Sequence, residues 1–96
     1  MKDDILHIID VKVIRDYILK LEFNNGAVKI VDAKPLLTGP VFKPLNNPGF
    51  FAKVSIDPVA QTVVWPNGVD LAPEALFELK AVDSVAEHIK TDTGVT

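Results

Sequence analysis

Three observations predict an α+β domain: a small antiparallel sheet of two β-hairpins, a proline-rich packed arm between them, and one or two C-terminal helices. Apolar and polar residues alternate between residues 8 and 32, and turn-forming residues divide the chain into short runs. Helical spacing of apolar residues appears late, after Pro73. With 96 residues, of which 48% are hydrophobic, the chain suits one domain over residues 1–96.

Two strands are predicted at residues 8–14 and 17–23, joined by a tight turn at Arg15-Asp16. The apolar residues of the second run occupy every other position: Tyr17, Leu19, Leu21 and Phe23. This spacing is the period of a half-buried strand, so one face of the predicted strand points to the core.

A hairpin follows at Asn25-Gly26, a pair of residues that favours a type I′ turn because both central positions need positive φ. A two-residue loop gives three cross-strand pairs: Phe23 with Val28, Glu22 with Lys29, and Leu21 with Ile30. Large apolar residues then meet on one face and opposite charges on the other. The same register places Asp32 on the inward face of the third strand.

Residues 33–52 form an arm that four prolines keep from becoming a long regular element. Its many apolar residues predict that the arm packs across the sheet. Within it, Asn47 and Pro48 are typical of an N-cap followed by the first helical residue.

A second hairpin is predicted from residues 54–57 and 62–65, with the turn at residues 57–60. Pro73 then starts a helix. Leu71 and Leu76 lie at the spacing of a hydrophobic staple if Ala72 is the N-cap.

The C-terminal region has a helical pattern over residues 81–90, followed by a frayed tail at 91–96. One face of the predicted helix is apolar, and we call it the C-terminal stripe: Val82, Val85, Ala86 and Ile89. Ser84 and Glu87 match a capping box, so either a second helix begins at Ser84 or the first continues from Pro73. The stripe predicts self-association into a homodimer or contact with a protein partner.

Composition excludes several classes of protein. Ten Lys+Arg against thirteen Asp+Glu give a net charge of −3, and the lysines form no basic block, so direct nucleic-acid binding is not expected. The absence of cysteine excludes disulfides and thiolate metal sites. Apolar runs are too short for a membrane span or a signal peptide, which predicts no membrane association and a cytoplasmic location.

No cofactor, metal site or enzymatic activity is predicted. His7 and His88 lie near opposite ends of the chain, which does not suit metal ligation. Neither Ser55 nor Ser84 lies in a nucleophile motif. The five glycines form no phosphate-binding loop.

Three residues have both a structural and a functional interpretation. Asp32 either accepts backbone N–H groups from the turn before Pro35 or is a buried carboxylate of a site. Asp70 either accepts backbone N–H groups in the connection to the helix or contacts a substrate. Trp65 is either a core anchor or part of a binding surface.

The segment from Trp65 to Phe77, WPNGVDLAPEALF, resembles the signature of the domain-of-unknown-function family 2442. Other matching parts are Leu19-x-Leu21-x-Phe23 with Asn25-Gly26, Asp32, Pro35-Leu36-Leu37, Val41-Phe42 and Leu45. The resemblance covers about residues 8–80. It implies a small bacterial α+β domain and brings no catalytic residues. Some relatives are encoded beside small partner proteins in arrangements similar to toxin–antitoxin pairs, and some related domains are joined to a DNA-binding helix-turn-helix.

Two functions follow as hypotheses. The first is a non-enzymatic interaction module, antitoxin-like or a regulatory accessory protein, which uses an exposed strand edge or the C-terminal stripe. The alternative is a small-ligand-binding or enzymatic domain, which predicts that Asp32, Trp65 and Asp70 converge in one open pocket.

Overall fold

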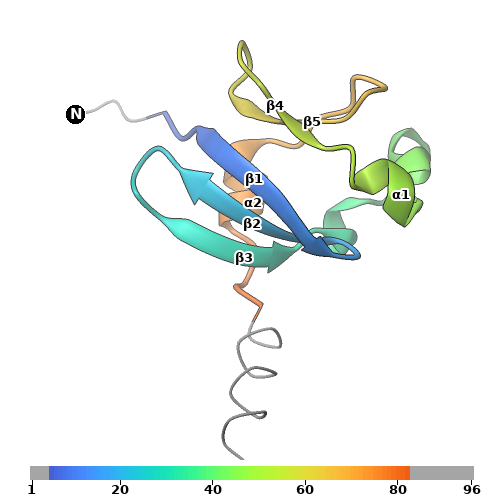
Figure 1. The fold of residues 1–96 in the computed structure, drawn as a ribbon, viewed down its shortest axis with the longest axis horizontal. Coiled ribbons are helices and arrows are strands. Elements are labelled where there is room, and N and C mark those ends of the chain that lie inside the picture. Colours follow the sequence, from blue (N-terminus) through green and yellow to red (C-terminus); the bar gives the residue numbers. More distant parts are fainter. Residues whose placement is uncertain (1–4, 83–96) are drawn as a thin grey trace, which may run out of the picture.

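The structure, a computed structural model, describes residues 5–82. It has an α+β fold, as the sequence predicts, and its antiparallel strands are divided between two sheets (Figure 1). The larger sheet has the order β1-β2-β3, with strands at Ile8–Arg15, Ile18–Phe23 and Val28–Asp32. The smaller sheet pairs β4 (Ser55–Asp57) with β5 (Thr62–Val64). The strands of the predicted hairpins therefore belong to separate sheets.

Short helices connect and cover the sheets. The proline-rich arm contains three of them, at Lys34–Leu36 (η1), Pro40–Asn46 (η2) and Pro48–Phe51 (α1). In α1 the Asn47 side chain accepts a hydrogen bond from Phe50 N, so the predicted N-cap is confirmed. Helix α2 (Pro73–Phe77) lies behind the larger sheet, while the arm lies at one end of it (Figure 1).

The loop between β2 and β3 has three residues, so the predicted two-residue turn and its register are wrong by one position. Phe23 N donates to Ala27 O at 2.8 Å, and Gly26 N donates to Phe23 O at 3.0 Å. Gly26 has a φ of +91°, as the last residue of such a three-residue loop requires. The cross-strand pairs are Glu22 with Val28, Leu21 with Lys29, and Lys20 with Ile30.

Asn24 explains the longer loop, because its side chain fastens the chain that enters β1. Its Oδ1 accepts from His7 N at 2.9 Å, and its Nδ2 donates to Ile5 O at 2.9 Å. Its own backbone N–H donates to His7 O at 3.0 Å. These bonds take Asn24 out of the β2–β3 ladder and join it to a segment seventeen or more residues away.

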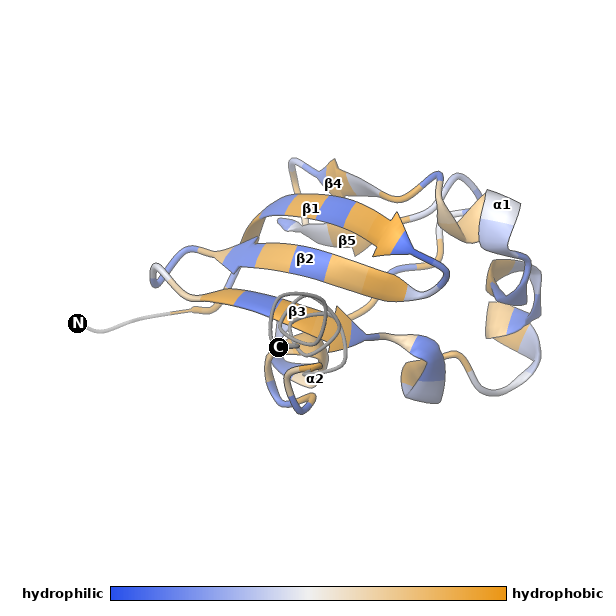
Figure 2. Cartoon of the chain, turned by 60° about the horizontal axis from the view of Figure 1, so that its bottom comes forward, coloured by the Kyte–Doolittle hydropathy of each residue, from blue (hydrophilic) through white to orange (hydrophobic). Residues whose placement is uncertain are grey.

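Because the register differs by one residue from the predicted one, the residues of β3 that were expected to point to the core point to solvent, and the reverse. Val31 lies opposite Leu19 and is fully buried, whereas Asp32 lies opposite Ile18 and is exposed. The predicted inward position of Asp32 is therefore wrong. The alternation is visible as bands of hydropathy along β1 and β2 (Figure 2).

One core lies between the larger sheet, α2 and the second hairpin. Its central members are each buried to 2% exposure or less: Ile8, Leu19, Leu21, Phe23, Val31, Ala33, Leu45, Phe51, Val63, Trp65 and Leu76. Phe23 packs edge-on against Phe77 of α2, with ring centroids 5.0 Å apart. Leu71 is also buried and Ala72 is the N-cap of α2, in agreement with the predicted staple.

Helix α2 ends at Phe77, which excludes the alternative of one helix that continues from Pro73 through the C-terminal region. The chain instead turns to the outer edge of β3. Ala81 forms an antiparallel bridge with Val31, and Val82 N donates to Ile30 O at 2.7 Å. A helix beginning at Ser84 and the tail at 91–96 lie outside the described residues.

No helix in residues 5–82 is both long enough and apolar enough to cross a membrane.

Candidate functional site

Trp65 is a core residue. Its exposed fraction is 2%, and its ring lies 5.3 Å from the Phe51 ring, measured between centroids. The indole Nε1–H donates to Phe51 O at 2.8 Å, which satisfies the buried polar atom. The ring is therefore not available to form an open binding surface with exposed carboxylates.

Asp32 ends β3 and holds the turn into the arm. Its Oδ1 accepts a hydrogen bond from Lys34 N at 3.0 Å, and the residue is exposed. This contact is the turn interaction that the sequence suggested as its structural interpretation. Lys34 is the first residue of the short helix η1, and Pro35, which has no backbone N–H of its own, is the second.

Asp70 does not have the predicted role in the connection to α2. Asn67 has that role, because its Oδ1 accepts from Val69 N at 3.2 Å. Asp70 forms an isolated antiparallel bridge with Val64 and is exposed. Within residues 5–82, the side-chain hydrogen bond in this connection is the one accepted by Asn67, and the Asp70 carboxylate takes part in none.

The three residues of the alternative hypothesis do not share a pocket. Trp65 is inside the core, whereas Asp32 and Asp70 are exposed at the ends of different sheets. Within residues 5–82, no three His, Cys, Asp or Glu side chains gather closely enough to hold a metal ion.

The C-terminal stripe is described at its first member. Val82 is half-buried, and its backbone N–H pairs with Ile30 on the edge of β3. Val85, Ala86 and Ile89 lie outside the described residues. The described part of the chain therefore ends with the first residue of the stripe at a sheet edge.

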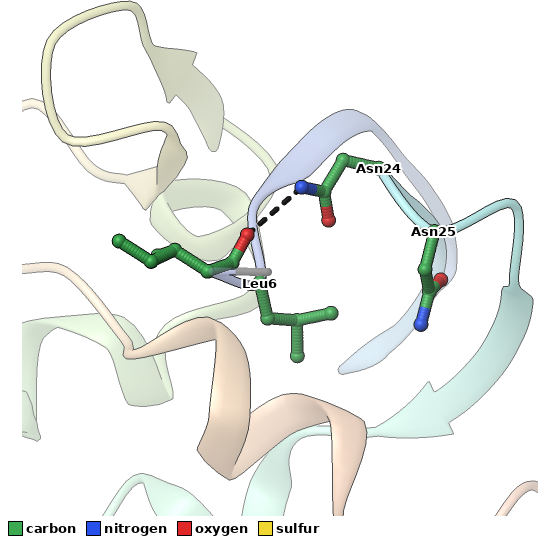
Figure 3. Close-up of a pocket in the computed structure, with 4 residues that line it drawn as sticks. Leu6, Asn24 and Asn25 are labelled. Atoms are coloured by element: carbon green, nitrogen blue, oxygen red, sulfur yellow. Dashed lines mark hydrogen bonds between the residues drawn. The ribbon is translucent and has the colours of Figure 1, made fainter. Parts of the chain in front are cut away.

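A pocket of about 430 Å³ lies beside the β2–β3 loop, where sequence analysis predicted none. Its described lining consists of Ile5, Leu6, Asn24 and Asn25. Figure 3 shows the Asn24 amide turned to the Ile5 carbonyl, so this group is already engaged. None of these four side chains ionises, and they offer no acid–base chemistry.

The outward face of the larger sheet carries a charge pattern that the sequence alone did not indicate. Asp10 lies directly opposite Glu22, and Lys12 directly opposite Lys20. All four side chains are exposed. Like charges that face each other across neighbouring strands are destabilising, by amounts comparable to the stabilisation from opposite charges. The pairs become apparent once the strands 8–15 and 18–23 are aligned through their two bulges.

Comparison with known proteins gives one result. Residues 8–81 match the model of a family described as "Protein of unknown function (DUF2442)". Neither the curated proteins nor the solved structures contain a match to this chain.

Proposed function

The chain belongs to DUF2442, and on that premise we propose that it is a non-enzymatic interaction module of the antitoxin-like or regulatory accessory kind. The observation that carries this proposal is the pairing of Ala81 and Val82 with the outer edge of β3. This pairing holds Val82, the first residue of the C-terminal stripe, at the outer edge of β3. A partner protein of matching apolar character can then contact the stripe and the domain together.

The positions of the remaining candidate residues support the same proposal. Trp65 fills the core and Asp32 holds a turn, so both side chains serve the fold. The apolar stripe, in contrast, has four residues that the sequence places on one face of a predicted helix, which is the pattern of a helix that packs against another surface.

The experiment uses the full chain, tagged and captured from its native host, with quantitative identification of co-purifying proteins. Any protein recovered in stoichiometric amount is then purified and mixed with the chain, and the mass of the complex is measured by analytical ultracentrifugation. We expect Val85→Asp with Ile89→Asp to weaken this complex at least about tenfold, because two charges enter an apolar contact.

The matched control changes polar positions of the same stretch, Asp83→Asn and Glu87→Gln, and is expected to leave the complex intact. If a purified partner binds the Val85→Asp, Ile89→Asp variant as tightly as the unmodified chain, the stripe is not the contact. If no protein is recovered stoichiometrically from the host, the proposed function is wrong.

A further inference from the structure

We propose that the outward face of the β1-β2-β3 sheet is a self-complementary surface that binds a second copy of this chain. The proposal concerns self-association through strand residues, so it is separate from the partner contact proposed for the C-terminal stripe. Figure 1 looks onto this face, with α2 behind the sheet.

Two neighbouring rows of side chains cross the face at right angles to the strands. The first row is acidic on two strands and apolar on the third: Asp10, Glu22 and Val28. The second row is basic on the same two strands and apolar on the third: Lys12, Lys20 and Ile30. Residues two apart on a strand point to the same face, so both rows face outward.

The exposure of these residues shows that the described chain leaves the rows open. Asp10, Lys12, Lys20 and Glu22 are exposed, and Val28 has an exposed fraction of 54%. Ile30 is half-buried beside Val82. Within residues 5–82, the ion pair found is Arg15 with Asp16, at 3.5 Å, outside both rows.

A two-fold axis relates the two rows to each other. The axis runs parallel to the rows, between the two stacked sheets, and lies midway between the two rows. Rotation about it places the first row of one copy over the second row of the other copy. On β1, Asp10 then faces Lys12 of the second copy, and on β2, Glu22 faces Lys20 of the second copy. On β3, Val28 faces Ile30 of the second copy. Each row therefore meets its complement on all three strands.

This complementarity selects a second copy as the occupant. Within one chain, each row places like charges side by side, which is unfavourable. The two-fold arrangement gives every charge an opposite partner across the interface, and a two-fold contact of this kind closes on itself as a dimer. Face-to-face sheets pack about 10 Å apart, which long lysine side chains can bridge.

The test is a set of charge-reversed full-length chains in analytical ultracentrifugation, with folding checked by circular dichroism. The acidic variant carries Lys12→Glu and Lys20→Glu, and the basic variant carries Asp10→Lys and Glu22→Lys. We expect each variant alone to self-associate at least about tenfold more weakly than the unmodified chain, because all facing charges then repel. An equimolar mixture of the two is expected to form a mixed dimer.

The fourfold variant, with both pairs of substitutions in one chain, is the matched control. It exchanges the two rows while preserving their complementarity, so it should dimerise like the unmodified chain. Because all four charged positions have changed, its dimerisation would show that the charge pattern, and not any single charged side chain, drives association. We also expect the dimer of the unmodified chain to weaken as salt is raised, because facing charges at a surface are screened.

Three results would overturn the proposal. The first is an unmodified chain that stays monomeric up to about 1 mM, a weak limit for a specific contact. The second is a dimer whose strength the acidic and basic variants leave unchanged. The third is a dimer that is lost in Val85→Asp, Ile89→Asp while both charge-reversed variants retain it, which would assign self-association to the C-terminal stripe. A partner complex from the preceding experiment can survive all three, so the two proposals fail separately.

Discussion

Lys29 shows how a lysine side chain can line a core while its ammonium group is paired with backbone carbonyls at the margin of that core. It lies opposite Leu21, on the face of β3 that points to the core, and it is half-buried. Its aliphatic stem crosses apolar surface while its Nζ donates to Phe77 O and, at 2.8 Å, to Leu79 O. The ammonium group thereby satisfies carbonyls at the C-terminal end of α2, where helices favour positive charge.

We expect Lys29→Met to lower the free energy of unfolding by about 1–3 kcal/mol, because it leaves two carbonyls without their charged donor. Urea denaturation followed by circular dichroism measures the change. Lys43→Met, at an exposed position of the arm, is the control and should stay within about 0.5 kcal/mol. Equal losses in both variants would show that Lys29 contributes no more than a surface lysine.

The sequence predicted individual roles well where they depend on neighbours in the chain. The turn contact of Asp32 and the capping contact of Asn47 each involve a residue two or three positions away. Asp70 was predicted by the same reasoning, yet Asn67 occupies the acceptor position in its turn. Asn67 and Asp70 are both suitable side-chain acceptors for a backbone N–H in this turn, and the local sequence pattern did not distinguish between them.

At the scale of elements, the strands and the arm were predictable because their signals are periodic or depend on proline. The register of β2 against β3 was not. The side chain of Asn24 forms hydrogen bonds with the backbone of Ile5 and His7, and no pattern in the neighbouring sequence indicates these long-range contacts. The charge rows of the outward face depend on the alignment of β1 with β2, including two bulges, and could not be derived from strand positions alone.

We expect Gly26→Ala to destabilise the protein by about 1–2 kcal/mol, the cost of a left-handed conformation for a residue with a Cβ. The φ of Gly26 is +91°, and no atom lies within 4 Å of an added Cβ, so the cost is in the backbone. Gly26→Asn should lose less, because asparagine tolerates positive φ. Thermal unfolding of the two variants provides the comparison, and a larger loss for asparagine would point to a steric cause.

At the scale of the whole molecule, β1 joins the two sheets. Ile8 pairs with Phe23 of β2, and its backbone N–H donates to Gln61 O, beside β5, at 3.0 Å. Its side chain has an exposed fraction of 1% and belongs to the shared core. The two sheets are therefore expected to unfold together.

We expect Ile8→Ala to cost about 2–5 kcal/mol, as for other large-to-small changes in a core. Fluorescence of Trp65, which follows β5, and far-UV circular dichroism should report the same unfolding midpoint in urea before and after the substitution. Ile9→Ala is the matched control, since Ile9 is its neighbour with an exposed fraction of 55%. Two separate midpoints would show that the sheets are independent cooperative units.

The pairing of Ala81 and Val82 with β3 has a consequence for how the molecule avoids uncontrolled growth. An uncovered β-strand at the margin of a sheet presents a row of free amides and carbonyls, which is a template for further chains. Strand-to-strand addition that joins different edges of successive copies does not close, so it extends into fibres. By covering part of that row, residues 81 and 82 limit polymerisation at β3. A shortened chain that stops before Ala81 would uncover these groups and be prone to filament formation.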